Sequence, residues 1–475
     1  MTQSHRSVGV LLAGGIGARV GLGIPKQLIK IAGKAIVEHT LEALDKSPDI
    51  DDVLIMMNAD TIDELGHLLG DSRFPKLKQI LPGGETRNDS TKLAIDALTA
   101  DGAGDDTKVL FHDAVRPFID QRIIHDCVEA LDEYDAVDTA IPSADTIIQI
   151  DDSNHISGMP DRDFLRRGQT PQAFRLGVIR EAYRIAARDS EFRASDDCGV
   201  VFAYMPEVPI YVVPGTPQNM KVTEPIDVHI ADKLFQLQSE SLALSSSGEL
   251  PASLEGKSIV VFGGNYGIGS SIVELAEAGG ANVVEYSRST TGTDVRYRKH
   301  VRRALADAEE KLGSIDLVVI TAGVLRMGPL VESKKKDVLD TIRLNLGAPV
   351  LVAKEAFQYL AKTRGQLTLF TSSSYTRGRA NYGVYSATKA GVVNLTQALS
   401  EEWAEAGIRV NCINPQRTAT PMRMKAFGDE PAETLLDPDD VARVTLNVAA
   451  SDLTGQIVTV QVAAMNAMRD QRDEE

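Results

Sequence analysis

Short apolar runs alternate with amphipathic stretches along the first half of the chain. The apolar runs are SVGVLLAGG, DDVLIMMN, TKVLFHD, DAVDTAIP and PIYVVPG. Runs of this length and composition are typical of buried strands. The intervening stretches, such as AIVEHTLEALDKS and QRIIHDCVEALDEY, have helical periodicity. This alternation predicts an α/β domain with a largely parallel sheet.

A second series of the same kind follows a break in the pattern. After Lys233 the periodicity fades into LFQLQSESLALSSSGELPASLEG, which predicts a helix tail and a linker. Further strand-like runs then follow, namely KSIVVFGG, ANVVEYSR, IDLVVITAG, GQLTLFTSSS, IRVNCINP and GQIVTVQ. We therefore predict a first domain over residues 1–235, a linker over 236–253 and a second domain over 254–475.

Size and composition agree with two globular domains. A chain of 475 residues exceeds the roughly 250 to 300 residues at which one core stops growing. The sequence lacks both a membrane-spanning apolar run and the features of a signal peptide, so we expect a cytoplasmic protein. Its net charge of −17 disfavours binding to nucleic acid or to an acidic membrane. The three cysteines, Cys127, Cys198 and Cys412, are spaced too far apart to predict a disulfide framework or a zinc site.

The stretch VVFGGNYGIGSSIV combines a strand, a glycine turn and the start of a helix. Its glycines are Gly263, Gly267 and Gly269, with Ile268 between the last two. Where Cβ atoms are absent, backbone N–H groups and a helix N-terminus can approach a pyrophosphate. A purely structural turn is the alternative for this stretch alone.

A tyrosine and a lysine in NYGVYSATKAG lie one helical turn apart. Tyr385 and Lys389 occupy positions i and i+4 and therefore share a helix face. An ammonium beside a phenol favours the phenolate, so we expect Lys389 to lower the pKa of Tyr385 and make it a usable general acid or base. The serine cluster of LTLFTSSSY precedes them, and Asn345 lies further upstream.

These features, with ITAG, INP and TGQIVTVQ in the same order, resemble the short-chain dehydrogenase/reductase family over nearly the whole second half. The resemblance implies a doubly wound Rossmann fold in which Tyr385 protonates the substrate oxygen while hydride arrives from a nicotinamide. It further implies that Lys389 binds the cofactor ribose, that a serine polarises the carbonyl and that Asn345 holds a proton-relay water. The serine is Ser372 by the family's usual spacing and Ser373 if the spacing is one residue shorter, and both remain open.

The end of the second strand of this half predicts which cofactor is used. VVEYSRS places Ser287 and Arg288 where an acidic residue would otherwise meet the ribose 2′-hydroxyl, and an arginine there can pair with a 2′-phosphate. We therefore expect NADPH, with a merely solvated Arg288 as the alternative. The resemblance adds Asp294 as an adenine contact and Ala322 and Gly323 as cofactor neighbours. It has two departures: Thr321 replaces the usual Asn before Ala322 and Gly323, and Gln416 replaces the Gly expected after INP.

The first glycine loop, LLAGGIGARVGLGIPKQ, departs from the spacing of a dinucleotide fingerprint. After Gly15 and Gly17 the next glycine is Gly21, and the cations Arg19 and Lys26 lie close by. Such a loop suits a triphosphate under attack, because charge develops on its phosphoryl oxygens. A turn with two ordinary surface cations is the alternative.

Two more segments of the first half carry polar groups. PGGETRNDS, residues 82–90, is a glycine-rich turn suited to reading a base edge. LFHDAVRPF places Asp113 directly after a strand, where a carboxylate can bind Mg²⁺. A helix cap or a loop salt bridge is the alternative for each.

In order, these segments and ADTI, DRDFLRRGQTPQAF, ASDD and NMKVTEPID resemble the cytidylyltransferases that couple CTP to a sugar-alcohol phosphate. The resemblance implies a Rossmann-like nucleotidyltransferase sheet, a divalent metal at Asp113 and, because the arginine at the position of Arg162 can reach across an interface, a homodimer. The implied residues for the nucleotide are Ala13, Gly14, Gly15, Gly17, Gly84, Glu85, Arg87 and Ser90. Those implied for the triphosphate are Arg19, Lys26 and Lys221, and those for the acceptor phosphate are Thr146, Arg162 and Thr170.

The presence of both halves in one chain narrows the choice of acceptor substrate. Methylerythritol phosphate and ribitol 5-phosphate are similar in size and charge, but only ribitol 5-phosphate is one reduction away from ribulose 5-phosphate. The domain order resembles bifunctional enzymes that make CDP-ribitol for capsule or related polymers from ribulose 5-phosphate, NADPH and CTP. A methylerythritol phosphate cytidylyltransferase with an unrelated reductase is the second interpretation. A nucleotide-sensing scaffold is the third, and the intact Tyr385, Lys389, Arg19 and Lys26 argue against it.

Overall fold

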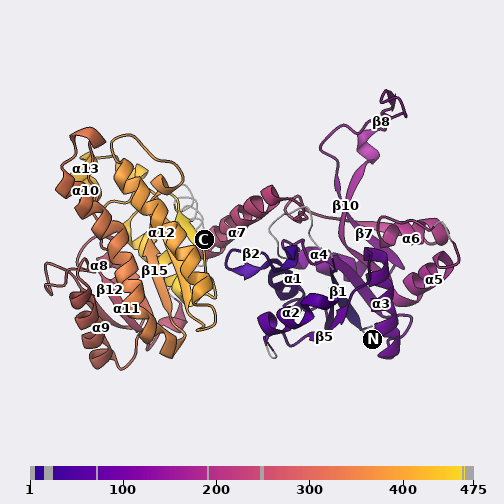
Figure 1. Ribbon diagram of the computed structural model, residues 1–475, viewed down its shortest axis with the longest axis horizontal. Helices are drawn as coiled ribbons and strands as arrows, with labels where there is room; N and C mark the ends of the chain where they lie inside the picture. Colours follow the sequence, from indigo (N-terminus) through magenta and orange to yellow (C-terminus); the bar gives the residue numbers. More distant parts are fainter. Residues whose placement is uncertain are drawn as a thin grey trace, which may run out of the picture. The chain divides into compact units, whose positions relative to one another are not determined.

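The chain forms two compact units, Met1–Ala231 and Asp232–Glu475, each built on its own β-sheet (Figure 1). The structure is a computed structural model that describes residues 6–14, 25–70, 73–189, 192–245, 251–462 and 465. Within these residues no helix is long and apolar enough to cross a membrane. Cys127, Cys198 and Cys412 are all buried and free.

The first unit contains a seven-stranded sheet with the order β11-β7-β10-β6-β1-β4-β5. Strand β10 runs antiparallel to its neighbours β6 and β7, and the other neighbouring strands are parallel. The strands are β1 (Ser7–Ala13), β4 (Asp52–Met57), β5 (Leu77–Pro82), β6 (Lys108–Asp113), β7 (Ala136–Pro142), β10 (Arg166–Arg175) and β11 (Ile210–Pro214). The parallel sheet expected from the sequence therefore has one antiparallel strand within it.

Helices cover both faces of this sheet. Every residue of β1 is buried, which agrees with its unbroken apolar run and with a strand covered on two sides. One face packs against α1 (Ile36–Asp45), α2 (Ile62–Leu69) and α4 (Gln121–Ala130). The other packs against α3 (Arg87–Ala100), α5 (Leu176–Ala186) and α6 (Asp197–Tyr204).

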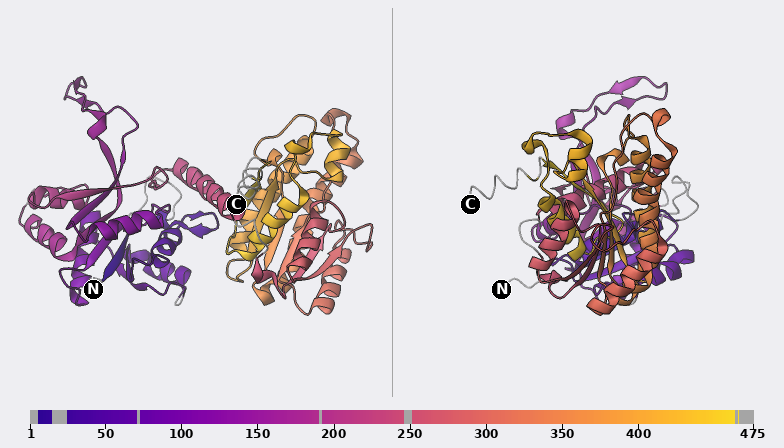
Figure 2. Two further views of the ribbon diagram at one scale, coloured as in Figure 1. Left: turned by 180° about the vertical axis from the view of Figure 1, so that it is seen from behind. Right: turned by 90° about the vertical axis from the view of Figure 1, so that its left-hand side faces the viewer.

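A narrow arm, residues 146–164, projects from the sheet of the first unit (Figures 1 and 2). It contains a two-stranded hairpin of β8 (Gln149–Ile150) and β9 (Ile156–Gly158). Large apolar side chains on the arm are exposed, including Ile150, Ile156, Met159 and Phe164. The arm therefore offers apolar surface that the unit itself does not cover.

The second unit contains a six-stranded parallel sheet with the order β13-β12-β14-β15-β16-β17. Its strands, all expected from the sequence, are β12 (Ser258–Phe262), β13 (Asn282–Tyr286), β14 (Leu317–Ile320), β15 (Gln366–Phe370), β16 (Arg409–Pro415) and β17 (Ile457–Val460). One face packs against α8 (Ile268–Ala278) and α14 (Pro438–Ala450), and the other against α9 (Arg298–Leu312), α11 (Ala348–Thr363) and α12 (Gly383–Glu402). The predicted two-domain α/β organisation, with a doubly wound second domain, is confirmed.

The winding of the second sheet determines where a ligand can enter. Helix α8 follows β12 on one face, and α9 leads into β14 on the opposite face. In open α/β sheets the crevice lies where neighbouring connections leave toward opposite faces, at the carboxyl ends of the strands. That position lies between the loops after β12 and β14. The shorter helices α10 (Lys335–Ile342) and α13 (Pro421–Phe427) follow loops at this same edge.

Helix α7 (Pro225–Ser245) crosses the division between the two units. Residues 236–245, expected as the first part of a linker, continue this helix. Its first residue is Pro225, and proline is favoured at the first helical position. The Leu, Gln, Glu and Ala residues that follow favour a helix although the apolar periodicity has faded.

The Phe111–Phe174 pair gives a direct test of the first core. Both rings are fully buried and their centroids lie 6.2 Å apart. We expect Phe174→Ala to lower the free energy of unfolding by about 3–5 kcal/mol, because it removes buried contacts and leaves a cavity. Phe202→Ala, at a ring that is 76% exposed, is the control and should change it by less than about 0.5 kcal/mol. Equal urea midpoints for the two variants would contradict this packing.

Candidate active sites

The carboxyl end of β6 carries a buried carboxylate surrounded by cations. Lys221 Nζ lies 2.9 Å from Asp113 Oδ2, Arg116 Nε lies 3.4 Å from the same oxygen, and Arg87 Nε lies 3.6 Å from Oδ1. Burial favours the protonated acid, but the charges of Lys221, Arg87 and Arg116 outweigh it and hold the pKa of Asp113 well below its usual range. A cluster of cations around one anion is well suited to receive a polyphosphate.

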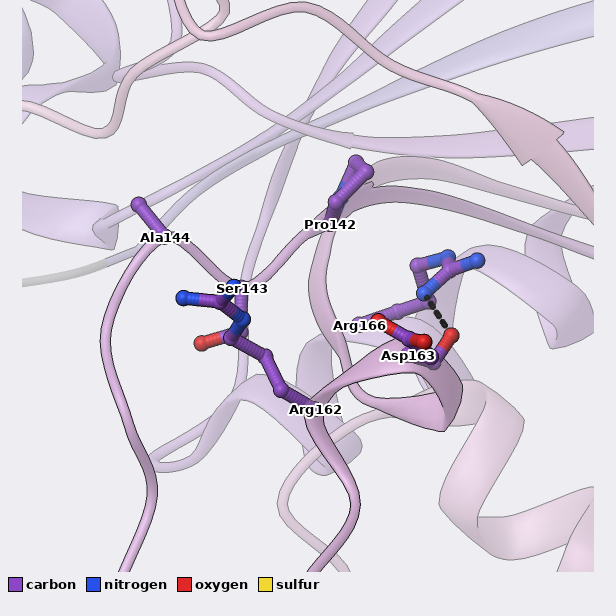
Figure 3. A pocket seen from close by; sticks show the side chains of 6 residues that line it. All are labelled: Pro142, Ser143, Ala144, Arg162, Asp163 and Arg166. Atoms are coloured by element: carbon purple, nitrogen blue, oxygen red, sulfur yellow. Dashed lines mark hydrogen bonds between the residues drawn. The ribbon is translucent and has the colours of Figure 1, made fainter.

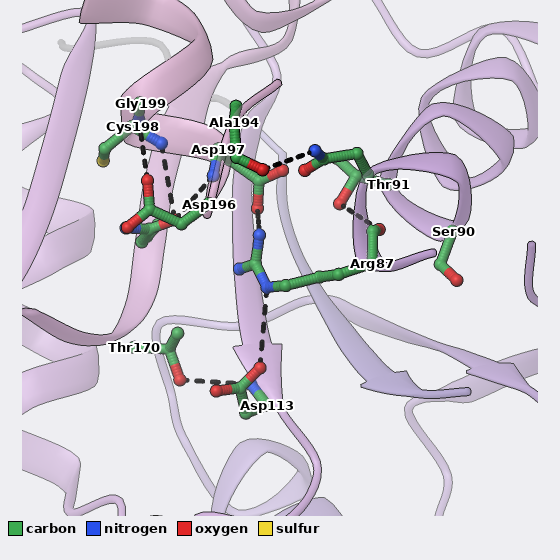
Figure 4. Close-up of polar contacts among 12 residues, drawn as sticks. Arg87, Ser90, Thr91, Asp113, Thr170, Ala194, Asp196, Asp197, Cys198 and Gly199 are labelled. Carbon is green, nitrogen blue, oxygen red and sulfur yellow. Dashed lines mark hydrogen bonds and ion pairs between the residues drawn. The ribbon is translucent and has the colours of Figure 1, made fainter. Parts of the chain in front are cut away.

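Arg87 is anchored from behind by a second carboxylate. Its Nη1 lies 2.6 Å from Oδ2 of the fully buried Asp197. The Tyr183 hydroxyl donates to the other Asp197 oxygen at 2.6 Å. Figure 4 shows the guanidinium between Asp197 and Asp113, and its Nη2 is buried without a hydrogen-bond partner among the described residues. Arg87, which the sequence places at the nucleotide, is therefore held by Asp197 so that its guanidinium faces Asp113.

Thr170 fixes the backbone of the same strand end. The Asp113 N–H donates to Thr170 Oγ1 at 3.1 Å, and His112 Nδ1 lies 3.0 Å from the same hydroxyl. His112 Nε2 lies 3.1 Å from the Arg116 carbonyl oxygen, which can only accept, so Nε2 carries the ring proton and Nδ1 accepts from Thr170. Burial lowers the pKa of His112 to about 4, which keeps the ring neutral. In this arrangement the Thr170 hydroxyl has no hydrogen left for the acceptor phosphate assigned to it.

The turn of residues 82–90 packs against the end of β1 because glycines leave room. Gly84 N–H donates to Ser90 Oγ at 3.1 Å, a Cβ on Gly83 would lie 2.9 Å from that oxygen, and a Cβ on Gly14 after β1 would be in ordinary contact with it at 3.4 Å. Glu85 is exposed beside them. Gln27 Nε2, in η1 (Lys26–Leu28), donates to the Ala13 carbonyl at the end of β1 at 2.6 Å. Lys26 begins η1, whereas Gly15, Gly17 and Arg19 lie outside the described residues.

A pocket of about 410 Å³ lies at the base of the arm (Figure 3). Arg166 beside it is tied to the backbone, because its Nη1 donates to the carbonyls of Asp163 and Leu165 at 2.9 and 3.0 Å. The lining residues are Pro142, Ser143, Ala144, Arg162, Asp163 and Arg166. Of the three residues expected at the acceptor phosphate, Arg162 lies here, Thr146 is exposed on the arm and Thr170 lies beside Asp113.

The glycine turn between β12 and α8, called the glycine cradle below, is packed so tightly at Gly263 and Gly269 that a Cβ would clash with the domain's own backbone. Gly263 has φ +97°, and a Cβ there would lie 2.7 Å from Ala322 N. A Cβ on Gly269 would lie 2.2 Å from the Gly263 carbonyl oxygen, and Gly267, with φ +59°, immediately precedes Ile268 at the start of α8. Thr321, which replaces the family's Asn, donates to the Gly263 carbonyl at 3.0 Å. A bare backbone at a helix N-terminus fits a pyrophosphate.

The ends of β15 and α12 bring the expected catalytic side chains together. Tyr385 shares a side-chain hydrogen bond with Ser372, whereas Ser373 Oγ accepts from Arg379 Nη2 at 3.2 Å. Lys389 Nζ lies 5.7 Å from the centroid of the Tyr385 ring and donates to the Phe370 carbonyl at 2.9 Å. Of the two serines that the sequence left open, Ser372 thus faces Tyr385 and Ser373 faces Arg379.

The expected lowering of the Tyr385 pKa is wrong for this arrangement. Burial raises the pKa of Tyr385, and the hydrogen bond with Ser372 opposes that effect only in part. Burial also lowers the pKa of Lys389 to about 8, and its ammonium faces the Phe370 carbonyl. Tyr385 therefore keeps its proton at neutral pH, which is the form required of a proton donor.

Other expected cofactor residues are held by neighbours within the second unit. Asn345, in the π-helical turn η6 (Arg343–Gly347), accepts from the Val324 N–H and donates to the Val324 carbonyl, each at 2.8 Å. Its side chain thus fixes the loop after β14, where Gly323 passes it closely enough that a Cβ there would lie 3.4 Å from Asn345 Oδ1. The two oxygens of Asp294 both accept from Arg296, which holds the pKa of Asp294 below its usual value.

The end of β13 has a cluster of hydroxyl groups. Buried Ser287 lies with its Oγ 2.7 Å from Thr290 Oγ1 and 3.2 Å from Ser289 Oγ. Asn265, in the glycine turn, donates to Ser289 Oγ at 2.8 Å. Arg288 is exposed beside this cluster. The cluster and the glycine turn therefore lie at one edge of the sheet.

Each half matches a known family model, and one relative matches both halves. Residues 8–237 match the model described as 2-C-methyl-D-erythritol 4-phosphate cytidylyltransferase, and residues 255–462 match the model described as enoyl-(acyl carrier protein) reductase. The bifunctional ribulose 5-phosphate reductase/CDP-ribitol pyrophosphorylase of Haemophilus influenzae is 43% identical over 460 residues, covering 96% of this chain and 96% of its own. The chain belongs to this bifunctional family.

Other relatives match one half only. The 2-C-methyl-D-erythritol 4-phosphate cytidylyltransferase of Thermobifida fusca is 44% identical over 235 residues, which cover 49% of this chain and 94% of its own. A solved 4-diphosphocytidyl-2C-methyl-D-erythritol synthase from Anaerococcus prevotii has a TM-score of 0.44 at 28% identity and covers 49% of this chain and 100% of its own. This member of the bifunctional family has a cytidylyltransferase domain followed by a reductase domain.

Several polar residues of this bifunctional family member were not singled out from the sequence. Arg116 lies within LFHDAVRPF and Asp197 within ASDD, so the motifs contained them without indicating their partners. Tyr183 lies on an amphipathic helix that predicts only a core position. The pairing of Arg87 with Asp197 spans 110 residues, and only the folded sheet brings them together.

Asp197 is expected to stabilise the cytidylyltransferase domain through Arg87. We predict that Asp197→Asn lowers the free energy of unfolding by about 3 kcal/mol, because it removes one of two carboxylates that balance a buried guanidinium. Asp196→Asn is the matched control: Asp196 caps α6 by accepting from the Gly199 N–H at 2.7 Å, and because an asparagine oxygen can accept the same bond, this change should alter the free energy of unfolding by less than about 0.5 kcal/mol. Thermal denaturation in which both variants melt alike would contradict the assigned role.

Proposed function

We propose that the reductase domain reduces D-ribulose 5-phosphate to D-ribitol 5-phosphate with NADPH, and that the cytidylyltransferase domain couples this product to CTP. The products of the second reaction are CDP-ribitol and pyrophosphate. The main support for this proposal is the relative that matches 96% of the chain, since the match spans both domains in the same order. A location in the cytoplasm and a role in capsule or related polymer synthesis are further parts of this proposal.

In the reductase domain, Tyr385 serves as the proton donor. A bound nicotinamide cofactor would supply the hydride for the carbonyl carbon. Ser372, which shares a hydrogen bond with Tyr385, orients the carbonyl oxygen so that the Tyr385 proton passes to it. Lys389, buried with its Nζ 5.7 Å from the centroid of the Tyr385 ring, is assigned to the ribose of the bound cofactor.

The cofactor cradle fits a phosphorylated dinucleotide. A side chain at Gly263 or Gly269 would clash with the domain's own backbone, and Gly263 and Gly267 have positive φ, so the glycines keep the turn tight at the start of α8, where backbone N–H groups can bind a pyrophosphate. Exposed Arg288, next to the hydroxyls around Ser287, supplies a cation for a 2′-phosphate. These features support NADPH over NADH.

In the cytidylyltransferase domain, the cations around Asp113 hold the triphosphate. A phosphate oxygen of ribitol 5-phosphate attacks the α-phosphorus of CTP, one phosphorus–oxygen bond forms, and the bond to the pyrophosphate leaving group breaks. Lys221, with Lys26 and Arg19, stabilises the charge that develops on the phosphoryl oxygens. The protein supplies no nucleophile, so positioning and charge provide the rate enhancement.

Asp113 is the proposed metal ligand. Among the described residues, no three His, Cys, Asp or Glu side chains group closely enough to hold a metal by themselves. Mg²⁺ is commonly bound by one or two carboxylates together with substrate phosphates and water. One ionised carboxylate at a polyphosphate site fits that donor set, and Asp113 would hold the ion there.

The exposed arm supports a homodimer. Ile150, Ile156, Met159 and Phe164 are each more than half exposed, which is costly for a monomer. A second copy of the same arm provides complementary apolar surface, as a two-fold interface requires. A second copy would also bring another Arg162 to the site.

The choice of acceptor separates this function from its nearest alternative. The match of the first half to 2-C-methyl-D-erythritol 4-phosphate cytidylyltransferases makes methylerythritol phosphate the competitor. We expect kcat/KM for pyrophosphate release to be at least tenfold higher with ribitol 5-phosphate than with methylerythritol phosphate. Release with methylerythritol phosphate alone would replace the proposal by that alternative.

The two reactions should be separable by single substitutions. Tyr385→Phe removes the proton donor, so we expect NADPH oxidation to fall by at least a hundredfold while pyrophosphate release from added ribitol 5-phosphate persists. Lys221→Ala removes a cation from the triphosphate site, so pyrophosphate release should fall while NADPH oxidation persists. Absorbance of NADPH and a pyrophosphate assay measure the two activities, and loss of both in either variant would contradict separate sites.

Dimerisation should depend on the arm. Phe164 is 84% exposed on the arm, and Phe202 is 76% exposed on α6. We expect Phe164→Asp to shift the sedimenting species from dimer to monomer, because a charge would be buried at the interface, and Phe202→Asp to leave the dimer intact. A monomeric parent protein, or a dimer that survives Phe164→Asp, would contradict an arm-mediated interface.

A further inference from the structure

Arg379 is fixed close to the catalytic side chains of the reductase domain. Its Nη2 donates to Ser373 Oγ at 3.2 Å, and its Nη1 donates to the Tyr382 hydroxyl at 3.4 Å. Ser373 is the immediate neighbour of Ser372, and the rings of Tyr382 and Tyr385 pack edge to face with centroids 6.3 Å apart. The Arg379 guanidinium thus hydrogen-bonds to Ser373, which is next to Ser372 in sequence, and to Tyr382, whose ring packs against Tyr385.

The segment that carries Arg379 is held in place by the backbone. Asn381 adopts φ +70°, and its carbonyl accepts from the Gly328 N–H at 2.6 Å. This bond ties the loop before α12 to the loop after β14, on the edge of the sheet where the crevice lies. Arg379 therefore has a defined position although its side chain is exposed.

Arg379 is held by hydroxyl groups, whereas two other arginines of the reductase domain pair with carboxylates. Arg326 pairs with Asp337 at 2.6 Å, and Arg423 pairs with Glu430 at 2.6 Å. In the described parts of the chain, Arg379 forms hydrogen bonds to two neutral hydroxyl groups and no ion pair with a carboxylate. Its charge is available for an anionic ligand, and a guanidinium can bind a phosphate with two parallel hydrogen bonds.

We propose that Arg379, positioned by Ser373 and Tyr382, is the binding residue for the terminal phosphate of the reductase substrate and restricts this domain to phosphorylated ketoses. The inference rests on the proposed reduction of a ketose phosphate. In a 2-ketopentose 5-phosphate the carbonyl carbon and the phosphorus are five bonds apart, which at about 1.5 Å per bond allows a span of at most about 7 Å. Arg379 hydrogen-bonds to Ser373, the residue after Ser372, and this position suits a phosphate within that distance of the carbonyl.

The test compares ribulose 5-phosphate with unphosphorylated ribulose as substrates for NADPH oxidation. We expect Arg379→Ala to raise KM for ribulose 5-phosphate at least tenfold, because a charge-assisted pair with the phosphate is lost. The KM for NADPH and the slow rate with ribulose should stay within about twofold of the parent protein. Arg379→Lys keeps the charge and should recover part of the loss. Arg377→Ala, an exposed arginine of the same loop, is the matched control and should behave as the parent.

The outcomes separate the subsite from the function on which it rests. An unchanged KM for ribulose 5-phosphate in Arg379→Ala overturns the subsite alone. Equal losses with ribulose 5-phosphate and ribulose also overturn it, because they indicate a structural role in holding Ser373 and Tyr382. A parent protein that reduces neither substrate overturns the proposed reduction itself. Pyrophosphate release by Arg379→Ala checks that the variant is folded.

Discussion

Both sites depend on one constraint, which is that parallel strands must be joined by crossovers. A helix returns the chain to the start of the next strand, so the carboxyl ends of successive strands, and the loops that follow them, gather along one edge of the sheet. In the first domain this gathers the end of β1, the turn before α3 and Asp113 at the end of β6. In the second it gathers the glycine cradle after β12, the loop after β14 and the serines after β15. Side chains separated by a hundred residues become neighbours for this reason.

Local positive charge at these sheet edges provides the attraction for anionic ligands. The protein has a net charge of −17, yet its proposed ligands are CTP and sugar phosphates, which are also anions. The binding energy must therefore come from local cations. Arg87, Arg116 and Lys221 converge on Asp113, which holds them close together before any phosphate is bound. In the reductase domain neutral hydroxyls position Arg379, so its full charge remains for a ligand.

The sequence predicted the strands whose apolar pattern is strong, and these include every strand of the second sheet. It did not predict β10, because RRGQTPQAFR has little apolar periodicity and becomes a strand only between β6 and β7. The edge strand β5 was missed for the same reason. Spacing alone brought Tyr385 and Lys389 to one helix face, but it could not show that the lysine ammonium faces the Phe370 carbonyl or that burial raises the tyrosine pKa. The Arg87–Asp197 pair has no local sequence signal at all.

We propose that the two domains catalyse successive steps of one synthesis. The most direct measurement incubates the purified full chain with ribulose 5-phosphate, NADPH, CTP and Mg²⁺, and follows NADPH absorbance and pyrophosphate in the same sample. We expect pyrophosphate to appear only after NADPH oxidation begins, the two to approach one-to-one stoichiometry, and CDP-ribitol to be the nucleotide product by mass spectrometry. NADPH oxidation without pyrophosphate, or pyrophosphate formation that requires no NADPH, would contradict it.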